Sequence, residues 1–530
     1  MKTVLLGLDG ATFTILDDLV ARGLMPHLAT FYVRAARAVL TSTTLPLTPQ
    51  AWTSLATGRT AGHHGVSDWV RYEHTPGGTF GHINDSRDNH CETIWQYASR
   101  HGRRVTVLNY FGLAPPEPIN GHSMPGFTSG RHLRRSSYPP DLFAKLEAIE
   151  AFDVKILGLD LEIERRGLQE MRPDEWSEWI EHHIRRDRAW AAVLDYLMVH
   201  EPSDLTAIVL DGVDKLQHLA YRYLDPALAP AEPTAWVAEV TRLARSYFTL
   251  VDELLARVLD RAGSQARVFV VSDHGFCASH EILYVNKWLA DRGLLTWRGS
   301  VAEDDEQACA SQRPADDTNA IDVQRSQAFA LTPSCNGIFL NVPSGEYERV
   351  RDELTRGLHA ILGGDGGQVV TAVRKREESF PGPFMKHCPD LTLTLRDHGF
   401  ISVLNSREVV VPRSAATGTH HPNGIFLATG PGVRSGADLG RLSILDIAPL
   451  LAHSLGLEIP RDYEGVFPDA VYERSYLAND PPRVALASDQ EVVAAQRARS
   501  SAMSPQSDGE ADAEDAAIIL QRLKSLGYME

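Results

Sequence analysis

Short apolar runs recur along the chain and are separated by longer amphipathic segments. The runs are TVLLGLD (3–9), RVTVLN (104–109), TAIVLD (206–211), RVFVVSD (267–273), LTLTL (391–395) and GIFLATG (424–430). Continuous apolarity in such runs is typical of strands that are buried on both faces. Their alternation with helical segments predicts an α/β fold with a mostly parallel central sheet flanked by helices.

Three of the runs end in aspartate. Asp9, Asp211 and Asp273 each close a run, and Asp214 follows three residues after Asp211. In open parallel sheets, ligands bind beyond the carboxyl ends of the strands. We therefore expect acidic side chains along one rim of the sheet.

The segment 283–385 has a different pattern. It contains an acidic stretch of low hydrophobicity (302–319) and the run GIFLNV (337–342), which suits a strand of a smaller sheet. We interpret 283–385 as an inserted cap subdomain. Residues 1–282 and 386–475 then form a discontinuous catalytic core.

The last part of the chain, 476–530, predicts an acidic linker followed by an amphipathic helix. The stretch SPQSDGEADAED (504–515) is strongly acidic. It leads into a segment in which Ile519, Leu523 and Leu526 fall on one helical face. We expect this face to dock onto the body of the protein or onto a partner.

Composition narrows the class of protein. Apolar residues make up 43% of the 530 residues and charged residues 23%, which is typical of soluble globular chains. The net charge of −17, from 52 basic and 69 acidic residues, argues against binding to a nucleic-acid backbone. No nucleic-acid polymer is therefore expected as a partner.

The cysteine pattern and the hydropathy of the chain indicate the compartment in which the protein is expected. The five cysteines are scattered and lack CxxC spacing, which indicates neither a disulfide framework nor a thiolate zinc site. The apolar run before Asp9 is too short for a signal peptide. No run approaches the roughly 20 apolar residues that a membrane span needs. We expect a soluble, cytoplasmic protein that does not bind a membrane.

Candidate metal ligands stand in four separated clusters: Asp9 in GLDGA, Asp214 and His218 in DGVDKLQHLAY, Asp273 and His274 in VVSDHGF, and His420 in TGTHHPNG. Residues four apart, such as Asp214 and His218, face the same way on a helix. A single pair of this kind is usually an ordinary surface feature. Together, the order and the strand-end placement indicate a metal site, and this mixture of oxygen and imidazole suits zinc or manganese.

A cluster of hydroxyl side chains occupies TSTTLPLTPQAWTSLATGRTAGHHGV (41–66). Thr48 followed by Pro49 is typical of a helix start, with Thr at the N-cap and Pro at the first helical position. On this local evidence, Thr48 is as well explained as a capping residue as it is as a nucleophile.

The order of LDG, a threonine before a helix, DxxxH, SDHG and GTH resembles the alkaline phosphatase superfamily. The resemblance is greatest to its type I phosphodiesterase and nucleotide pyrophosphatase branch. It spans about residues 3–475, and YVNKWLADRGLL (284–295) is also similar to the segment that follows SDHG in that branch. It implies an alkaline phosphatase-like core and a metal-dependent hydrolase that acts on phosphodiester or pyrophosphate bonds.

The resemblance also implies a role for each candidate residue. One divalent ion would be bound by Asp9, Thr48, Asp273 and His274, and the other by Asp214, His218 and His420. Zinc is the expected metal, with manganese or iron as alternatives. In the family, the nucleophilic threonine stands nine residues before the threonine of a TG pair, and counting back from Thr57 gives Thr48. A covalent phosphothreonine would then form and be hydrolysed by water.

Substrate contacts follow from the same resemblance. A helix that starts at Thr48 would offer the N–H groups of Gln50 and Ala51 to phosphoryl oxygens. The nucleotide pyrophosphatases have TFPN where this chain has TPQA, so Ala51 replaces their asparagine, which argues against a nucleotide substrate. Lys215 and Gln217, beside the metal ligands, are candidate replacement donors.

Other residues in these motifs have simpler interpretations. We expect His63 and His64 to be structural turn residues and His421 to be a neighbour of the site rather than a ligand. Trp52 and Trp69 are interpreted as core residues.

Several alternatives remain beside a phosphodiesterase or pyrophosphatase of a small phosphate ester. A phosphonate hydrolase of the phosphonoacetate type resembles the chain equally well around the metals and also uses threonine. A phosphomutase would normally carry phosphate on serine. A catalytically inactive scaffold is the non-enzyme alternative, and the presence of all seven expected metal-site residues argues against it.

Overall fold

A mixed sheet of eight strands forms the centre of the molecule in the computed structural model, which describes residues 2–75, 78–150, 152–160, 163, 173–298 and 321–485. Across the sheet, the strands are β17 (Asp438–Ser443), β2 (Ala36–Thr41), β16 (Asn423–Thr429), β8 (Arg267–Val271), β1 (Thr3–Leu8), β7 (Leu205–Leu210), β5 (Val105–Tyr110) and β6 (Gly121–Pro125). Strands β8, β1, β7, β5 and β6 are parallel, while β16 is antiparallel to both of its neighbours. The predicted α/β fold with a mostly parallel sheet is confirmed.

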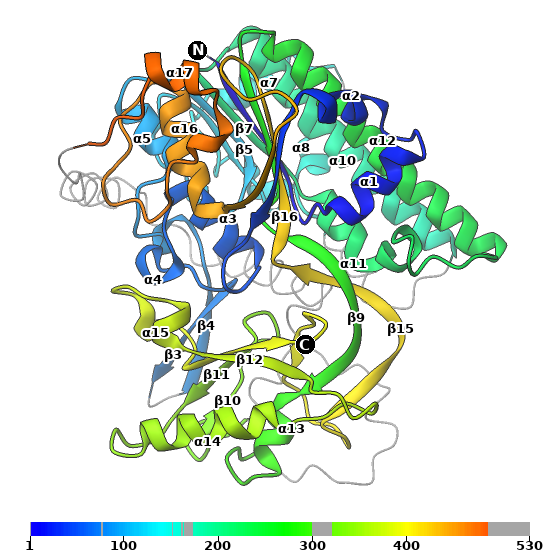
Figure 1. The fold of residues 1–530 in the computed structure, drawn as a ribbon, viewed down its shortest axis with the longest axis vertical. Helices are drawn as coiled ribbons and strands as arrows, with labels where there is room; N and C mark the ends of the chain where they lie inside the picture. The colour runs from blue at the N-terminus through cyan, green and yellow to red at the C-terminus, as the bar shows by residue number, and fades with distance from the viewer. Residues whose placement is uncertain are drawn as a thin grey trace.

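Helices cover both faces of this sheet (Figure 1). One face is covered mainly by α1 (Phe13–Ala21), α2 (Pro26–Arg34), α10 (Pro173–His200), α11 (Gly212–Leu224) and α12 (Ala235–Ala262), with the short α6 (Gly130–Leu133), α7 (Leu142–Leu146) and α8 (Val154–Leu157). The other face is covered by α3 (Thr48–Thr57), α5 (Ile94–Arg100), α16 (Ile447–Ser454) and residues of α17 (Arg474–Asn479). Along β1, Val4, Leu6 and Leu8 enter the first apolar cluster and Leu5 enters the second. Burial on both faces explains the continuous apolar run.

A smaller antiparallel sheet lies at the other end of the molecule (Figure 1). Its strands are, in order, β10 (Ala328–Phe329), β11 (Gly337–Leu340), β13 (Leu391–Leu395) and β12 (Val370–Lys375), accompanied by α13 (Val285–Ala290), α14 (Tyr347–His359) and α15 (Arg376–Ser379). We call this part the cap. The predicted strand in GIFLNV is confirmed as β11. The exact boundaries of core and cap stay a prediction.

The run LTLTL belongs to the cap sheet rather than to the central sheet, which corrects its grouping with the core strands. Its leucines Leu391, Leu393 and Leu395 enter the apolar cluster of the cap, while Thr392 and Thr394 alternate with them. Alternation of this kind is typical of an antiparallel strand with one face on a core. The pattern differs from the continuous apolarity of β1 or β8.

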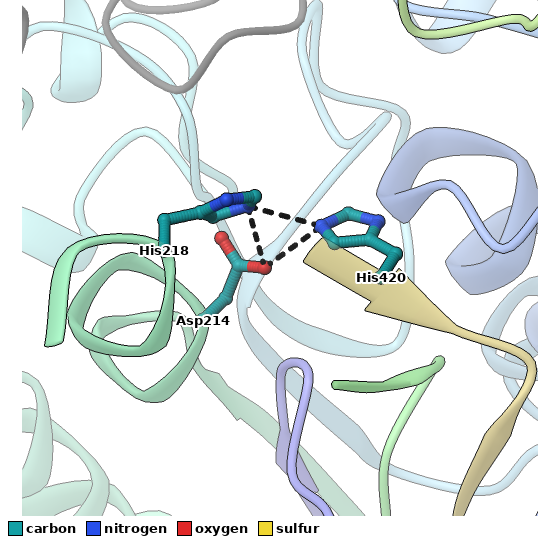
Figure 2. A group of neighbouring side chains, drawn as sticks. All are labelled: Asp214, His218 and His420. Atoms are coloured by element: carbon teal, nitrogen blue, oxygen red, sulfur yellow. Dashed lines mark hydrogen bonds and ion pairs between the residues drawn. The ribbon is translucent and has the colours of Figure 1, made fainter. Parts of the chain in front are cut away.

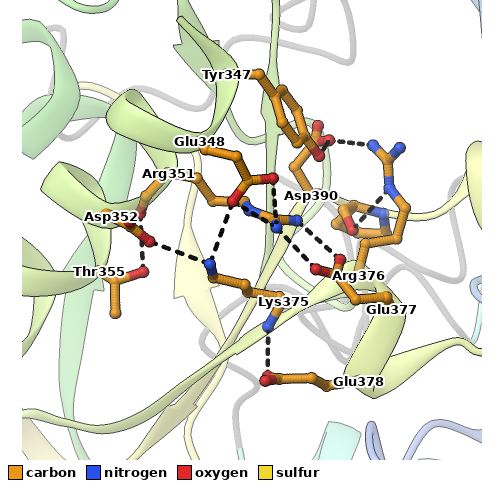
Figure 3. Close-up of polar contacts among 11 residues, drawn as sticks. Tyr347, Glu348, Arg351, Asp352, Thr355, Lys375, Arg376, Glu377, Glu378 and Asp390 are labelled. Carbon is orange, nitrogen blue, oxygen red and sulfur yellow. Dashed lines mark hydrogen bonds and ion pairs between the residues drawn. The ribbon is translucent and has the colours of Figure 1, made fainter.

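Charged side chains tie α14 to the neighbouring strand and helix of the cap, as Figure 3 shows. Arg351, whose side chain is only 4% exposed, donates to Glu348 on its own helix and to Glu377 of α15. Lys375, at the end of β12, is paired with Glu348 and Asp352. An isolated exposed ion pair contributes little, but these pairs share partners. The network therefore holds the cap helices in one arrangement.

Two connections join the cap to the core. The long strands β9 (Gly275–Tyr284) and β15 (Val410–His421) pair antiparallel and run from the central sheet to the cap, where β14 (Ile401–Ser402) joins β9 (Figure 1). The second connection is made near α4 (Ala61–His64), where the Gly62 carbonyl accepts a hydrogen bond of 2.8 Å from the Phe384 N–H. A Cβ on Gly62 would lie 2.3 Å from the carbonyl oxygen of Phe380, so only glycine permits this approach.

Asp68 reinforces the second connection. Its carboxylate accepts hydrogen bonds from Thr332 Oγ1 at 2.7 Å and from Ser334 Oγ at 2.8 Å. Asp68 lies just before the hairpin of β3 (Val70–Thr75) and β4 (Gly78–Ile83). The cap is thus held to the core through a buried carboxylate as well as through backbone.

Within the described ranges, no helix combines the length and the apolarity that crossing a bilayer requires. The acidic stretch 302–319 and the predicted docking face of Ile519, Leu523 and Leu526 lie outside the described residues.

Candidate metal centre

Strand direction brings the candidate residues to one edge of the central sheet. Because β1, β7 and β8 are parallel neighbours, Asp9, Asp211 and Asp273 follow strand ends on the same edge, as predicted. Strand β16 runs antiparallel to β8, so it begins at this edge, three residues after His420. Strand β2 is antiparallel to β16 in turn, and therefore ends there and leads towards Thr48.

Asp214, His218 and His420 form one group, shown in Figure 2. The Oδ1 atom of Asp214 lies 3.1 Å from His420 Nε2 and 3.4 Å from His218 Nε2, and the two Nε2 atoms are 3.1 Å apart. Asp214 and His218 stand one turn apart on α11, as their spacing predicted. His420 Nδ1 donates to the Pro46 carbonyl at 2.6 Å, which leaves the Nε2 lone pair directed into the group.

Asp9, Asp273 and His274 form a second group. His274 Nε2 lies 3.1 Å from Asp273 Oδ2 and 3.7 Å from Asp9 Oδ1, while its Nδ1 donates to the Gly275 carbonyl at 3.1 Å. The His274 and His420 rings stack with their centroids 3.5 Å apart, so the two groups adjoin. All three residues of this group are buried.

The two groups differ in their electrostatic surroundings. Burial raises the pKa of Asp273 to about 8, and the charge of Asp214 adds to the rise. Burial, followed by the charges of Asp273 and Asp214, raises the pKa of Asp9 well above its ordinary value. Burial also acts to raise the pKa of Asp214, but His218 and His420 outweigh it and hold that pKa below its ordinary value. Asp9 and Asp273 thus lie in an environment that lacks positive charge.

The donor set fits two divalent cations. Among the described residues, Asp9 Oδ1 and Asp273 Oδ2 have no hydrogen-bond donor although both are buried. Each group offers carboxylate oxygen and imidazole nitrogen atoms, all within 4.8 Å of one another. Two divalent ions bring four positive charges and three carboxylates remove three, so the surplus attracts a phosphate anion.

Thr48 is the first residue of α3 rather than its N-cap, which corrects the predicted helix start. The N-cap is Leu47, with extended backbone angles, and its carbonyl accepts from the Ala51 N–H at 2.8 Å. Thr48 therefore does not hold the capping position, and its Oγ1 lies 3.4 Å from His274 Nε2. Its hydroxyl therefore faces the second ligand group instead of the helix end.

The three predicted substrate-binding residues, Gln50, Ala51 and Lys215, differ in what surrounds them. The Ala51 N–H already donates to the Leu47 carbonyl, and its side chain packs in an apolar cluster, so a phosphoryl contact for Ala51 stays a prediction. Gln50 is buried in the first turn, and its Oε1 has no partner among the described residues. The Lys215 Nζ atom lies 3.4 Å from Asp211 Oδ2, so a phosphoryl contact for Lys215 stays a prediction.

The Asp211 carboxylate is part of a buried ionic group and of neither metal group. It accepts from Arg186, and from Asn109 Nδ2 at 3.0 Å. Gln217 Nε2 donates to the Gly10 carbonyl at 2.8 Å, which links α11 to the loop after β1. Neither Lys215 nor Gln217 faces solvent, since both are buried.

His64 and His421, which we interpret as residues other than metal ligands, have hydrogen-bond contacts outside the two metal groups. His64 is buried, its Nε2 lies 2.9 Å from Ser54 Oγ, and burial lowers its pKa to about 3. His421 Nδ1 accepts from the Asn423 N–H at 3.1 Å. However, His63 and His64 lie in the short helix α4 rather than in a turn.

Trp52 has a contact that sequence reasoning missed. It is a core residue as predicted, but its indole Nε1 also donates to Asp9 Oδ2 at 3.1 Å. The sequence did carry a signal for a place near the site. Trp52 stands four residues after Thr48, and residues four apart share a helix face.

The pKa of Asp273 predicts how the metal-free protein responds to pH. Its folded value of about 8 exceeds the unfolded value of 3.8, so the stability contributed by the protonated form is lost as pH rises between these values. Burial lowers the pKa of His274 and His420, so both rings are largely neutral above pH 6.5. We expect the Tm in the presence of chelator to fall by several degrees between about pH 6.5 and 8.

Thermal melts of wild type and Asp273→Asn check this expectation. The variant removes the titrating carboxyl and should show a flatter pH profile. With zinc added, the wild-type profile should reverse, because metal binding is favoured by deprotonated ligands. A metal-free Tm that is constant or rises over this interval contradicts the raised pKa.

Comparisons with known proteins agree with this geometry. The family model for type I phosphodiesterase/nucleotide pyrophosphatase matches residues 3–423. No curated protein matches the chain.

Solved structures show the same fold. Murine ectonucleotide pyrophosphatase/phosphodiesterase 5 is 14% identical with a TM-score of 0.51, and the match covers 89% of this chain and 100% of that one. An inactive form of it has been solved with AMP, again at 14% identity and a TM-score of 0.51, with 88% and 98% covered. Phosphonoacetate hydrolase from Sinorhizobium meliloti, in complex with phosphonoformate, is 17% identical with a TM-score of 0.52, with 86% and 95% covered.

Proposed function

This chain belongs to the type I phosphodiesterase/nucleotide pyrophosphatase family of the alkaline phosphatase superfamily, whose members hydrolyse phosphoester bonds, and we propose that it cleaves a small phosphodiester or pyrophosphate through a covalent phosphothreonine at Thr48. The observation that carries the proposal is the position of the Thr48 hydroxyl. It lies 3.4 Å from His274 Nε2, is not used to cap its helix, and stands beside buried carboxylate oxygens that lack donors.

Two divalent metal ions, proposed to be zinc, would be held at the two groups. Thr48, Asp9, Asp273 and His274 would hold one, and Asp214, His218 and His420 the other. Ligands that are only oxygen and imidazole nitrogen suit zinc, and also manganese and iron. When bound, the ions would supply positive charge that lowers the pKa of the Thr48 hydroxyl and neutralises the phosphoryl group.

The chain's own residues would carry out two displacements at phosphorus. In the first, Thr48 Oγ1 forms a bond to phosphorus, its proton leaves to solvent, and the leaving group departs with the bonding electrons. In the second, a water oxygen bonds to phosphorus and gives up a proton, while the bond to Thr48 breaks and its Oγ1 takes the bonding electrons and then a proton, which restores the hydroxyl. The start of α3 points its N-terminal dipole towards the phosphoryl oxygens, and the Gln50 N–H in its first turn is the proposed donor.

A phosphonate hydrolase is the second candidate. It is favoured by the structural similarity to phosphonoacetate hydrolase, which covers 95% of that enzyme. In that case the same attack by Thr48 would release a carbon leaving group. The burial of Thr48 supports a small substrate in either case.

We also propose a reducing, cytoplasmic compartment. In the part of the chain that the structure describes, Cys277, Cys335 and Cys388 form no disulfide. Cysteines in the thiol form are typical of a reducing compartment.

A panel of esters tests the reaction class. With zinc, we expect bis-p-nitrophenyl phosphate to be hydrolysed at least about tenfold faster than p-nitrophenyl phosphate, measured as kcat/KM. Phosphate release from phosphonoacetate, assayed in parallel, decides for the second candidate. A preference for the monoester contradicts both, and failure on every substrate with zinc, manganese or iron leaves the scaffold interpretation.

A further inference from the structure

The Trp52 side chain lies between helix α3 and strand β1, beside one metal group. It is 1% exposed, and its Nε1 donates to Asp9 Oδ2 at 3.1 Å. The other oxygen of the same carboxylate, Asp9 Oδ1, is buried without a donor among the described residues and lies 3.7 Å from His274 Nε2. One oxygen of Asp9 is thus held by the indole, and the other is left for a ligand.

Gly7 makes room for this indole. A Cβ at Gly7 would lie 2.6 Å from Cη2 and 3.2 Å from Cζ3 of Trp52, and 3.0 Å from Cγ2 of Val209. The ring can therefore lie against β1 only because Gly7 has no side chain. Tyr110 packs edge-on against the indole, with ring centroids 5.3 Å apart. The indole ring is therefore held between Gly7 of β1 on one side and the buried ring of Tyr110 on the other.

Helix α3 links this contact to Thr48. Trp52 follows Thr48 by four residues, so both side chains lie on one face of the helix. Thr48 Oγ1 faces His274, and Trp52 Nε1 faces Asp9. One rigid helical turn therefore fixes the position of the Thr48 hydroxyl relative to the Asp9 carboxylate.

We propose that Trp52 is a positioning residue of the metal centre. Its indole N–H holds Asp9 Oδ2, so that Asp9 Oδ1 is presented to the ion of the group with Asp273 and His274. Donors that orient a ligand from the outer shell typically contribute about 10- to 100-fold to metal affinity. The inference rests on the proposed metal-dependent function.

Zinc titration of the metal-free protein tests the inference, using a chromophoric chelator as competitor. In wild type we expect two binding sites. Trp52→Phe keeps a buried aromatic ring and loses the N–H, so it should weaken one site by about 10- to 100-fold and leave the other unchanged.

Trp190→Phe is the matched control. Trp190 is a fully buried indole whose Nε1 also donates to an oxygen at 3.1 Å, the Leu157 carbonyl, and it belongs to neither metal group. Its loss should leave both zinc affinities at the wild-type value. Melting curves of both variants without metal separate lost stability from lost metal binding.

Gly7→Ala is an independent route to the same contact. This variant keeps the indole N–H, but its new methyl group would displace the Trp52 ring from its position against β1. It should therefore weaken zinc binding at the same site as Trp52→Phe. In the Trp52→Phe background the added methyl should have a smaller effect, because phenylalanine lacks the Cη2 and Cζ3 atoms and only the contact with Val209 remains.

The outcomes separate this inference from the proposed function. Equal zinc affinity in wild type and in Trp52→Phe overturns the positioning role alone. Equal losses in Trp52→Phe and Trp190→Phe overturn it too, because a general packing effect would then explain both. If wild type binds no divalent metal, the proposed function fails and this inference fails with it.

Discussion

Replacing Thr48 by alanine should lower kcat by at least about a thousandfold while the metal content stays close to that of wild type. The physical reason is that no covalent intermediate can form without the hydroxyl, and losses of a nucleophile reach this size. The remaining ligands, Asp9, Asp273 and His274, still form their group in the variant. The measurement is turnover of the best ester of the panel at saturating substrate, with bound metal determined on the same preparation.

Thr53→Ala is the matched control for this variant. Thr53 is a buried threonine on the same helix and lies outside both metal groups. Its turnover should stay within a few-fold of wild type, and Thr48→Ser should retain part of the activity. A Thr48→Ala protein that keeps more than a tenth of the wild-type kcat would falsify the nucleophile assignment.

The second large effect is expected from loss of a metal group. His420→Ala should release metal and lower kcat/KM by a thousandfold or more, because the ring contributes Nε2 to the group with Asp214 and His218. The adjacent His421→Ala should keep both metal and activity, since His421 Nδ1 accepts from the Asn423 backbone and His421 belongs to neither metal group. Metal analysis and ester hydrolysis of the pair provide the measurement.

Chelation provides a reversible version of the same test. Removal of metal from wild type should abolish hydrolysis, and readdition of zinc should restore it. If His420→Ala and His421→Ala behave alike, the adjacent histidines cannot be distinguished as ligand and neighbour. Activity that persists in the chelated protein would exclude the metal-dependent reaction.

Most of the candidate site was predictable because its residues carry local signals. Strand-end aspartates at Asp9 and Asp273 follow runs whose apolar pattern identifies buried strands. The spacing of Asp214 and His218 places them on one helical face without knowledge of the fold. His420 was already a candidate ligand in TGTHHPNG, and the antiparallel direction of β16 explains why it reaches the same edge.

Other features were decided by neighbours that are remote in sequence. Gln217, a candidate donor beside the ligands, donates to the Gly10 carbonyl, 207 residues away in the sequence. The Ala51 side chain packs in an apolar cluster with residues of other elements. The sequence near each residue shows which positions share a helix face, but not what packs against that face.

By itself, the sequence determined the α/β fold, the order of strand-end aspartates and the position of Asp214 and His218 on one helix face, because periodicity and spacing are properties of single elements. Only the tertiary structure decided that LTLTL joins the cap sheet, that Thr48 is free of a capping role and that Trp52 holds Asp9. These outcomes depend on strand pairing and side-chain contact between segments far apart in the chain. Trp52 and Asp9 are 43 residues apart, and no local pattern records the hydrogen bond that joins them.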